Sequence, residues 1–153
     1  MAKHEAPKFG ELDRAACEAL LERHSVGRLA FAFHGRVGIT PVHYVFADGW
    51  IWGRTAPGAK LLTLQHHPYA AFEVDEVEGL FEWRSVVVHG TVYLPDKDDT
   101  EQQRASHERG VMHLRALYSN TFAAGDAAPD RTQVFHMHTS EMTGRYATTH
   151  TEQ

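Results

Sequence analysis

Residues 36–60 read RVGITPVHYVFADGWIWGRTAPGAK, two runs of β-prone residues on either side of one dipeptide. That dipeptide, Asp48-Gly49, is typical of the tight turn between antiparallel strands, because both residue types tolerate a positive φ. The stretch therefore predicts a β-hairpin with strands at 38–46 and 50–55. Pro41 cannot donate a hydrogen bond to a sheet, so we expect an edge or an irregularity near it.

The chain before this hairpin favours a helix and then a strand. Asp13 is suited to cap a helix that ends before Gly27, a residue type common just past a helix end. From Arg28 the apolar residues alternate with a period of two, which predicts a strand that ends at a His34-Gly35 turn. Residues 1–10 show no such pattern and are expected to form a flexible arm.

The chain after the hairpin alternates between the same two patterns. A short helix is predicted at 58–67, before Pro68, and a longer one at 100–118, where Thr100 and Gln103 form a capping-box pattern. The further predicted strands are 71–75, 84–94 and 133–137, the last with a candidate extension at 143–146. The predicted loops are the acidic segment 75–79 and the Ala/Gly/Asp/Pro-rich segment 120–131.

These segments amount to about six strands joined mostly by short turns, with two or three helices inserted between them. This order predicts a mainly β fold with added helices. Closure into an antiparallel barrel would remove the exposed sheet edges. A chain of 153 residues is long enough for one hydrophobic core, so we expect residues 1–153 to form a single domain.

The composition argues against several classes of function. A net charge of −5 gives no positive field for the phosphates of a nucleic acid, so no nucleic-acid partner is expected. No run of about 18 apolar residues predicts a membrane span, and the first residues lack the apolar centre of a signal peptide. Cys17 is the only cysteine, so no disulfide can form within the chain, and cytoplasmic residence is expected.

The loop after the second hairpin strand contains groups that bind phosphate. Arg54 and Lys60 can donate charged hydrogen bonds, Thr55 adds a hydroxyl, and Gly58 allows close approach to the backbone. Lys60 also lies near a predicted helix start, where free N–H groups and the helix dipole favour an anion. A solvated loop with two unrelated cations is the alternative, and composition alone favours that interpretation.

Five aromatic residues around this region are candidates to line a site for a flat ligand. They are Tyr44, Trp50, Trp52, Phe81 and Trp83. The competing interpretation is that their rings fill the barrel or a dimer interface, and the residues alone slightly favour it.

Twelve histidines raise the question of a metal site. His136 and His138 share one face of a predicted strand, but no third ligand stands at a defined spacing. We therefore expect no metal site, with a haem bound by one histidine as a lesser alternative. The chain has neither a Gly-x-Ser-x-Gly nucleophile motif nor a Gly-x-Gly-x-x-Gly dinucleotide motif, and no catalytic residue is predicted.

The order of the segments resembles the pyridoxamine 5′-phosphate oxidase-like, FMN-binding split-barrel superfamily, and within it the small nitroimidazole-reductase-like (Nim-type) proteins. The resemblance covers nearly the whole chain. It rests, in this order, on Val26-Gly27-Arg28-Leu29-Ala30, Thr40-Pro41-Val42-His43-Tyr44-Val45, Trp50 to Lys60, Leu61-Leu62-x-Leu64-x-x-x-Pro68 and Trp83 to Gly90.

The resemblance implies a split β-barrel that forms a homodimer, with FMN in a groove at the subunit interface. The residues implied to bind FMN are Val42, His43 and Tyr44 (backbone to the ring), Arg54, Thr55, Ala59 and Lys60 (phosphate), and Ser85 and Val86 (ring or ribityl chain). His43 and Tyr44 are the polar groups most expected near the ring. The facing subunit is expected to contribute from the region of Trp83 or from near Arg145.

The implied function is that of a flavin-dependent oxidoreductase acting on a small molecule. The alternatives are a barrel that binds the deazaflavin F420 or haem, and a flavin-binding protein without enzymatic activity. Many Nim-type relatives carry histidine where this chain has Gly53, so no histidine role carries over to that position. The arginine and lysine set that grips pyridoxine phosphate in true oxidases is not evident, which weakens pyridoxamine phosphate as the substrate.

Overall fold

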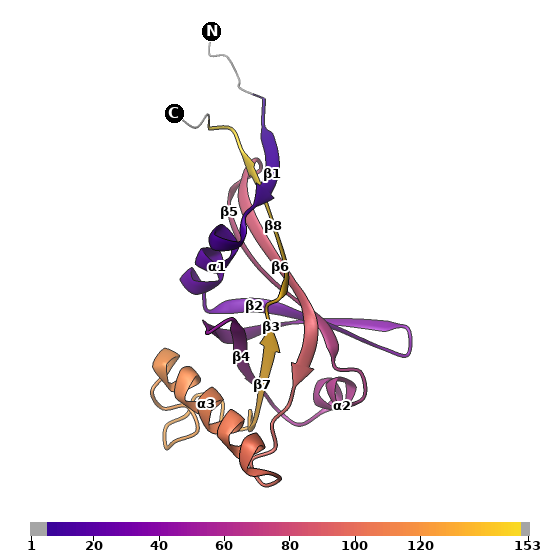
Figure 1. Cartoon of the computed structure of the whole chain (residues 1–153), viewed down its shortest axis with the longest axis vertical. Coiled ribbons are helices and arrows are strands. Elements are labelled where there is room, and N and C mark those ends of the chain that lie inside the picture. The colour runs from indigo at the N-terminus through magenta and orange to yellow at the C-terminus, as the bar shows by residue number, and fades with distance from the viewer. Residues whose placement is uncertain (1–5, 151–153) are drawn as a thin grey trace.

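The computed structural model describes residues 6–150, which form eight strands and three helices (Figure 1). The elements are β1 (Lys8–Leu12), α1 (Arg14–Arg23), β2 (Val26–Phe33), β3 (Arg36–Ala47), β4 (Trp50–Thr55), α2 (Ala59–His66), β5 (Tyr69–Gly79), β6 (Glu82–Tyr93), α3 (Glu101–Leu117), β7 (Gln133–His138) and β8 (Glu141–Thr148).

Six of the strands close into a ring in which every neighbouring pair is antiparallel. The sheet order is β1-β8-β6-β5-β2-β3-β4-β7, and β6 pairs with β7 as well. The ring therefore contains β6, β5, β2, β3, β4 and β7, while β8 and β1 extend the sheet beyond β6 toward the chain termini (Figure 1). The expected mainly β, antiparallel split barrel is confirmed, and the six strands predicted from the sequence are those of the ring.

Both predicted two-residue turns are present. Asp48 and Gly49 have φ angles of 54° and 80°, and His34 and Gly35 have φ angles of 50° and 74°. Positive φ at both central residues gives the backbone twist that antiparallel strands require. Pro41 lies where β3 pairs only with β2, since the pairing with β4 starts further along the strand. The missing N–H of this proline is therefore compatible with the sheet, as expected for an edge position.

Three predictions about the elements are wrong. Residues 8–10 do not belong to a flexible arm but to β1, which pairs with β8; residues 1–5 of that arm lie outside the described residues. β8 is a separate strand that pairs with β1 and β6 and does not extend β7. Residues 75–79 continue β5, because β6 pairs with them to the end of the hairpin. In each case pairing with another strand, distant in sequence for β1 and β8 and across the hairpin for residues 75–79, stabilises a segment with weak local signals.

The helices begin as predicted, but α1 ends differently. Asp13 accepts a hydrogen bond from the N–H of Ala16 at 2.8 Å, and Thr100 accepts one from the N–H of Gln103 at 3.1 Å. Gly27 does not cap α1: it belongs to β2, where an added Cβ would lie 2.2 Å from Cζ of Phe72. Within the described part of the chain, no helix is long and apolar enough to span a membrane.

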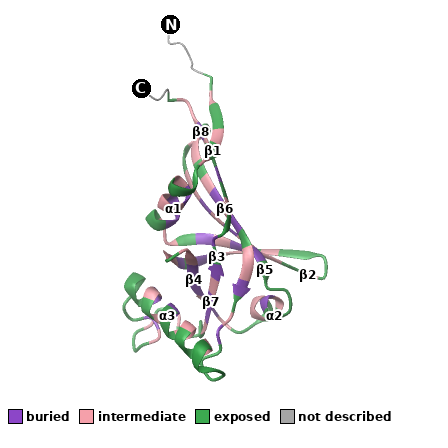
Figure 2. Cartoon of the chain, in the orientation of Figure 1, coloured by how far each residue is buried: buried purple, intermediate pink, exposed green. Residues whose placement is uncertain are grey.

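The core fills the interior of the ring. Its largest fully buried side chains include Leu29, Tyr44, Phe72 and Phe135, which come from β2, β3, β5 and β7. Figure 2 shows the buried residues concentrated on these strands, with exposed residues on α3 and on the long β2–β3 hairpin. The helices thus cover parts of the ring from outside, and the space between α3 and the ring contains the candidate site.

Candidate functional site

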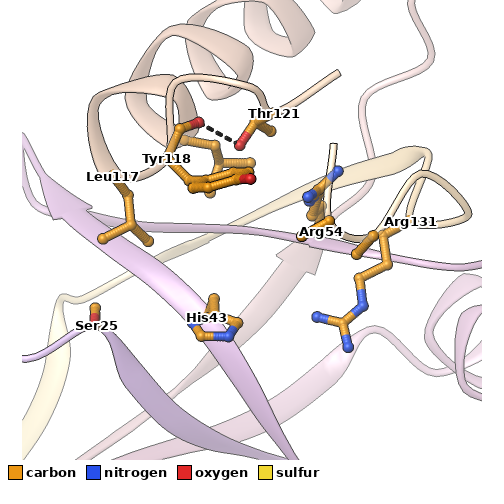
Figure 3. A pocket seen from close by; sticks show the side chains of 10 residues that line it. Ser25, His43, Arg54, Leu117, Tyr118, Thr121 and Arg131 are labelled. Carbon is orange, nitrogen blue, oxygen red and sulfur yellow. Dashed lines mark hydrogen bonds between the residues drawn. The ribbon is translucent and has the colours of Figure 1, made fainter. Parts of the chain in front are cut away.

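A cavity of about 480 Å³ lies between the ring and the carboxyl end of α3. Strands β3 and β4 form one wall, and the last turn of α3 with the following loop, residues 118–132, forms the other (Figure 3). Its polar lining consists of Ser25, His43, Arg54, Tyr118, Thr121 and Arg131. Leucines of α3 and alanines of the loop supply the apolar part, so the cavity combines cations with an apolar surface.

Helix α3 reaches this position because a glycine lets it approach the sheet closely. A Cβ added at Gly110 would lie 2.4 Å from Cγ1 of Val134 and 3.1 Å from Cε3 of Trp52. Glycine in a helix interior costs about 1 kcal/mol relative to alanine, and here the close contact with β4 and β7 is the compensating gain. This close packing determines how near Leu114 and Leu117 of α3 lie to β3 and β4.

Arg54 of β4 forms a bidentate ion pair with Asp126 of the loop. Its Nη1 and Nη2 each donate to a different carboxylate oxygen at 2.6 Å, and the two side chains are only 12% and 4% exposed. The carboxylate also accepts hydrogen bonds from the N–H groups of Phe122 and Ala128, at 2.9 and 3.0 Å. The hydrogen bonds from Arg54, together with those two N–H groups, hold the pKa of Asp126 well below its usual range.

Arg131 is a second cation of this cavity, and its charge affects the pKa of Lys60. The side chain of Arg131 extends from the loop into the same space as His43 (Figure 3). Lys60, in the first turn of α2, is partly buried, and its pKa is lowered by burial and by the charge of Arg131. Neither cation forms an ion pair with a carboxylate among residues 6–150. Cations brought together without a counter-charge favour the binding of an anion.

Strand β3 presents its three predicted flavin-contacting residues to opposite faces. Val42 and Tyr44 are buried in the core, and the Tyr44 hydroxyl donates to the carbonyl oxygen of Leu21 at 2.6 Å. Burial raises the pKa of Tyr44. His43 points outward and lines the cavity (Figure 3). Of the two polar groups expected near a flavin ring, only the His43 side chain is therefore available.

The other residues assigned to the phosphate differ in what they can offer. The hydroxyl of Thr55 is buried and donates to the carbonyl oxygen of Ala56 at 3.4 Å, and this side chain is not part of the cavity lining. Ala59 is the first residue of α2, so its contribution is a backbone N–H. A Cβ on Gly53 would lie 2.3 Å from Cζ of Phe135, which explains why no histidine stands there in this chain.

Ser85 and Val86 lie on β6, away from the lining of this cavity. Val86 is fully buried in the core, whereas the Ser85 hydroxyl donates to Oε2 of Glu73 at 3.2 Å. Arg28 holds Glu73 and Asp75 on the same side of the sheet, with N···O distances of 3.3 and 2.8 Å. Within one chain, the residues assigned to the ribityl chain and to the phosphate are therefore not brought together.

The five aromatic residues predicted as one cluster occupy three separate places: the core (Tyr44), the face of β4 beneath α3 (Trp50 and Trp52), and the β5–β6 hairpin (Phe81 and Trp83). Trp52 stacks on His136 of β7 with ring centroids 4.7 Å apart. The ring of Phe9 in β1 packs beside those of Phe81 and Trp83, with ring centroids 6.3 and 6.4 Å apart. The five rings therefore do not form a single ligand-binding cluster within one chain, because strand register distributes them over different faces; the position of Tyr44 in the core agrees with the competing interpretation that the rings fill the barrel.

His136 lies in a buried stack under α3. Burial, with a smaller contribution from the charge of Arg109, lowers its pKa to about 4. Its Nδ1 has no hydrogen-bond partner, and neither has Nε1 of Trp52 or Nε2 of His113. His136 and His138 gain no further ligand, since the described residues contain no group of three or more metal-ligating side chains.

Sequence reasoning missed two charged residues of the candidate site, Asp126 and Arg131. Both lie in the segment predicted as a loop of small residues. In such a segment Asp126 and Arg131 look like solvated surface residues, since Arg54, the partner of Asp126, is 72 positions away. Only the closure of the barrel brings β4 under this loop.

The model of a family described as pyridoxamine 5′-phosphate oxidase matches residues 13–146. No curated protein matches the sequence significantly. Among solved structures, an FAD-binding protein from Mesorhizobium loti has a TM-score of 0.71 and 23% identity, covering 94% of this chain and 99% of its own. A candidate 5-nitroimidazole antibiotic resistance protein from Bacteroides thetaiotaomicron has a TM-score of 0.67 and 16% identity, covering 94% and 89%. An FAD- and haem-binding protein from Mycobacterium smegmatis has a TM-score of 0.64 and 12% identity, covering 88% and 71%.

These structural similarities concern the fold, and they agree with the antiparallel split barrel described above. The family match runs from the cap of α1 to β8 and so includes the whole ring. The resemblance inferred from the order of sequence segments is confirmed by this match. The chain belongs to the pyridoxamine 5′-phosphate oxidase family.

Proposed function

We propose that this protein binds FMN as a homodimer and acts as an oxidoreductase on a small molecule. The observation that carries the proposal is the cavity in which outward-facing His43 of β3 meets the cations Arg54 and Arg131. A flavin mononucleotide combines a flat ring with one phosphate, and such a cavity offers an apolar surface and cations. Relatives described as FAD-binding support a flavin as the ligand.

The phosphate is proposed to lie at the cationic end of the cavity, near the start of α2. Gly58 precedes this helix and offers no side chain to cap it, so the first backbone N–H groups, including that of Ala59, lack a side-chain acceptor. Helix N-termini favour anions through these groups and through the helix dipole. Thr55 completes the proposed phosphate set through its backbone only, since its hydroxyl is buried.

The ring is proposed to lie along the outer side of β3, where the backbone of Val42–Tyr44 is accessible beside His43. The same face of β3 carries Val37 and Ile39, which are 78% and 71% exposed, in line with His43. A second copy that covers this apolar row would reach the edge of the cavity. Ser85 and the backbone of Val86 would then contact the flavin from the partner subunit, since the side chain of Val86 is buried in the core.

Bound FMN supplies the hydride or electron transfer. The residues of this chain bind its phosphate, orient its ring and exclude water with the leucines of α3. His43 is the titratable side chain on the ring side of the cavity, and it can donate a hydrogen bond to a substrate or to the ring.

The test of the cofactor is the absorbance spectrum and the mass of the small molecule that purifies with the protein. Flavin absorbance with the mass of FMN is the expected result, and the mass of FAD would correct the nucleotide. A Soret band would assign the site to haem. Colourless protein that does not bind added FMN would refute the proposal.

The test of the dimer is sedimentation at micromolar concentration, for the wild type and for Ile39→Glu. A charge on the apolar row should give a monomer with weakened FMN binding. Met112→Glu is the matched control, since Met112 is 60% exposed on α3, away from this row. A wild-type monomer that retains its flavin would contradict an interfacial site.

A further inference from the structure

We propose that Arg131 is the arginine that binds the phosphate, and that Arg54 with Asp126 acts as a clamp that positions the loop carrying Arg131. This inference rests on the proposed function, because it assigns the roles of residues within that cavity. It changes the role that the family resemblance implies for Arg54 from ligand to positioning residue.

The guanidinium of Arg54 is already engaged. Both terminal nitrogens donate to Asp126 at 2.6 Å, and the ring of Phe122 covers the guanidinium with its centroid 5.0 Å from Cζ. At 12% exposure the side chain has little room to rotate toward a ligand. A phosphate would have to displace a carboxylate that presents both its oxygens in ideal bidentate geometry.

The carboxylate of Asp126 is also fully hydrogen-bonded, and these hydrogen bonds hold the loop in its conformation. Besides Arg54 it accepts from the N–H groups of Phe122 and Ala128, so one carboxylate holds three separate points of the chain. Phe122 has a φ of 57°, an unfavourable left-handed conformation for a bulky residue. Such strain persists only where surrounding contacts impose it, and the clamp provides these contacts.

The remaining bonds of the loop complete its support. Nε of Arg115 donates to the carbonyl oxygen of Thr121 at 2.9 Å, and the Thr121 hydroxyl donates to the carbonyl oxygen of Tyr118 at 2.7 Å. The first half of the loop is thereby tied to the end of α3. Its second half, which leads to Arg131, is held by the bonds of Asp126 to Arg54 and to the N–H of Ala128, and by a turn in which the N–H of Arg131 donates to the carbonyl oxygen of Ala128 at 3.1 Å.

Arg131 has the properties that Arg54 lacks. It is exposed, it lines the cavity, and it has no carboxylate partner within residues 6–150. Its charge also contributes to lowering the pKa of Lys60, after the effect of burial. Because Asp126 balances the charge of Arg54, Arg131 and Lys60 supply the two positive charges that match a phosphate dianion.

The experiment compares FMN with riboflavin, which has the ring but no phosphate, in fluorescence titrations of the full-length protein. Arg131→Gln should weaken FMN binding about tenfold or more and change riboflavin binding less than about twofold. Asp126→Asn should also weaken FMN binding selectively, although it removes a negative charge from the cavity. Arg36→Gln, at the tip of the exposed β2–β3 hairpin, is the control for loss of one positive charge.

The direction in which Asp126→Asn changes FMN affinity distinguishes a positioning role of Arg54 from direct binding of the phosphate. If Arg54 bound the phosphate directly, removal of its carboxylate partner would leave FMN affinity unchanged or raise it, and the clamp would be refuted. If Asp126→Asn weakens riboflavin binding as well, Arg131→Gln decides, and unchanged FMN affinity in that variant overturns the inference. Wild-type protein that binds neither FMN nor riboflavin would refute the proposed function itself.

Discussion

Arg28 of β2 and Arg54 of β4 are both strand arginines that pair with carboxylates, but they belong to different electrostatic environments. Arg28 faces two acids: Nε lies 3.3 Å from Oε1 of Glu73, and Nη2 lies 2.8 Å from Oδ1 of Asp75. Burial and the neighbouring Asp75 raise the pKa of Glu73. Negative charge is thus in excess around Arg28, and an anion would gain nothing there.

The surroundings of Arg54 have the opposite balance. One acid, Asp126, neutralises Arg54, and Arg131 and Lys60 add two positive charges without an acid partner in the described chain. An arginine on a strand therefore does not by itself indicate an anion-binding site. In the site that we propose, the balance of charge around the cavity favours an anion, and it includes residues from β4 and from the loop after α3.

The largest expected effect comes from removing the cavity while leaving the Arg28 region intact. Gly110→Val should push α3 off β4 and β7, cost about 1–3 kcal/mol of unfolding free energy through overpacking, and abolish FMN binding. Chemical denaturation and FMN titration measure the two effects. Met112→Val, on the exposed side of the same helix, carries the same β-branched penalty and should retain binding. Full FMN affinity in Gly110→Val would show that α3 is not part of the site.

The next largest effect compares cations of the two regions directly. Lys60→Ala should weaken FMN binding about 10- to 150-fold, because a hydrogen bond to a charged group contributes about 1.5–3 kcal/mol. Arg28→Ala should instead lower stability and leave the ratio of FMN to riboflavin affinity unchanged. Calorimetric titration with both flavins measures the ratio. An altered ratio in Arg28→Ala, or an unaltered one in Lys60→Ala, would contradict the division between the regions.

Acid should loosen the α3 side of the molecule before the Arg28 side. The pKa of His136 is lowered to about 4 in the folded protein, so the unfolded chain, with a histidine pKa near 6.5, binds more protons between these values. Stability should therefore fall by about 2–3 kcal/mol as the pH drops from 6.5 to 4. His136→Phe should reduce this dependence, while His138→Phe, an exposed change on the same strand, should keep it. Hydrogen exchange that rises first in β5 and β6 would contradict the prediction.

The smallest expected effect concerns the two faces of β3. Tyr44→Phe removes the hydrogen bond to the Leu21 carbonyl and should lower stability by about 1 kcal/mol without changing FMN affinity. His43→Ala, on the outward face, should change flavin binding or its absorbance with little loss of stability. A flavin spectrum that responds to Tyr44→Phe but not to His43→Ala would contradict the proposal, because it would place the ring on the inner face of β3.

The ring strands, both two-residue turns and the helix N-caps at Asp13 and Thr100 follow from the sequence alone. These features depend on local chemistry: positive φ at Asp48 and Gly49, a carboxylate at Asp13, and apolar alternation along each strand. Arg54 and Lys60 could also be recognised in the sequence as candidate phosphate ligands, because they lie in one short segment of the chain. Strands β1 and β8 escaped prediction because their stability comes from pairing with each other and with β6.

The partners of these cations depend on contacts that only the folded chain makes, such as the ion pair of Arg54 with Asp126. The loop after α3 reaches Arg54 because the ring closes between β6 and β7 and α3 packs through Gly110, contacts that join residues far apart in sequence. The same closure sends Tyr44 into the core and His43 into the cavity, and it separates Ser85 from the phosphate residues. Local patterns fix backbone conformation, whereas charge balance in a cavity depends on which distant side chains meet there.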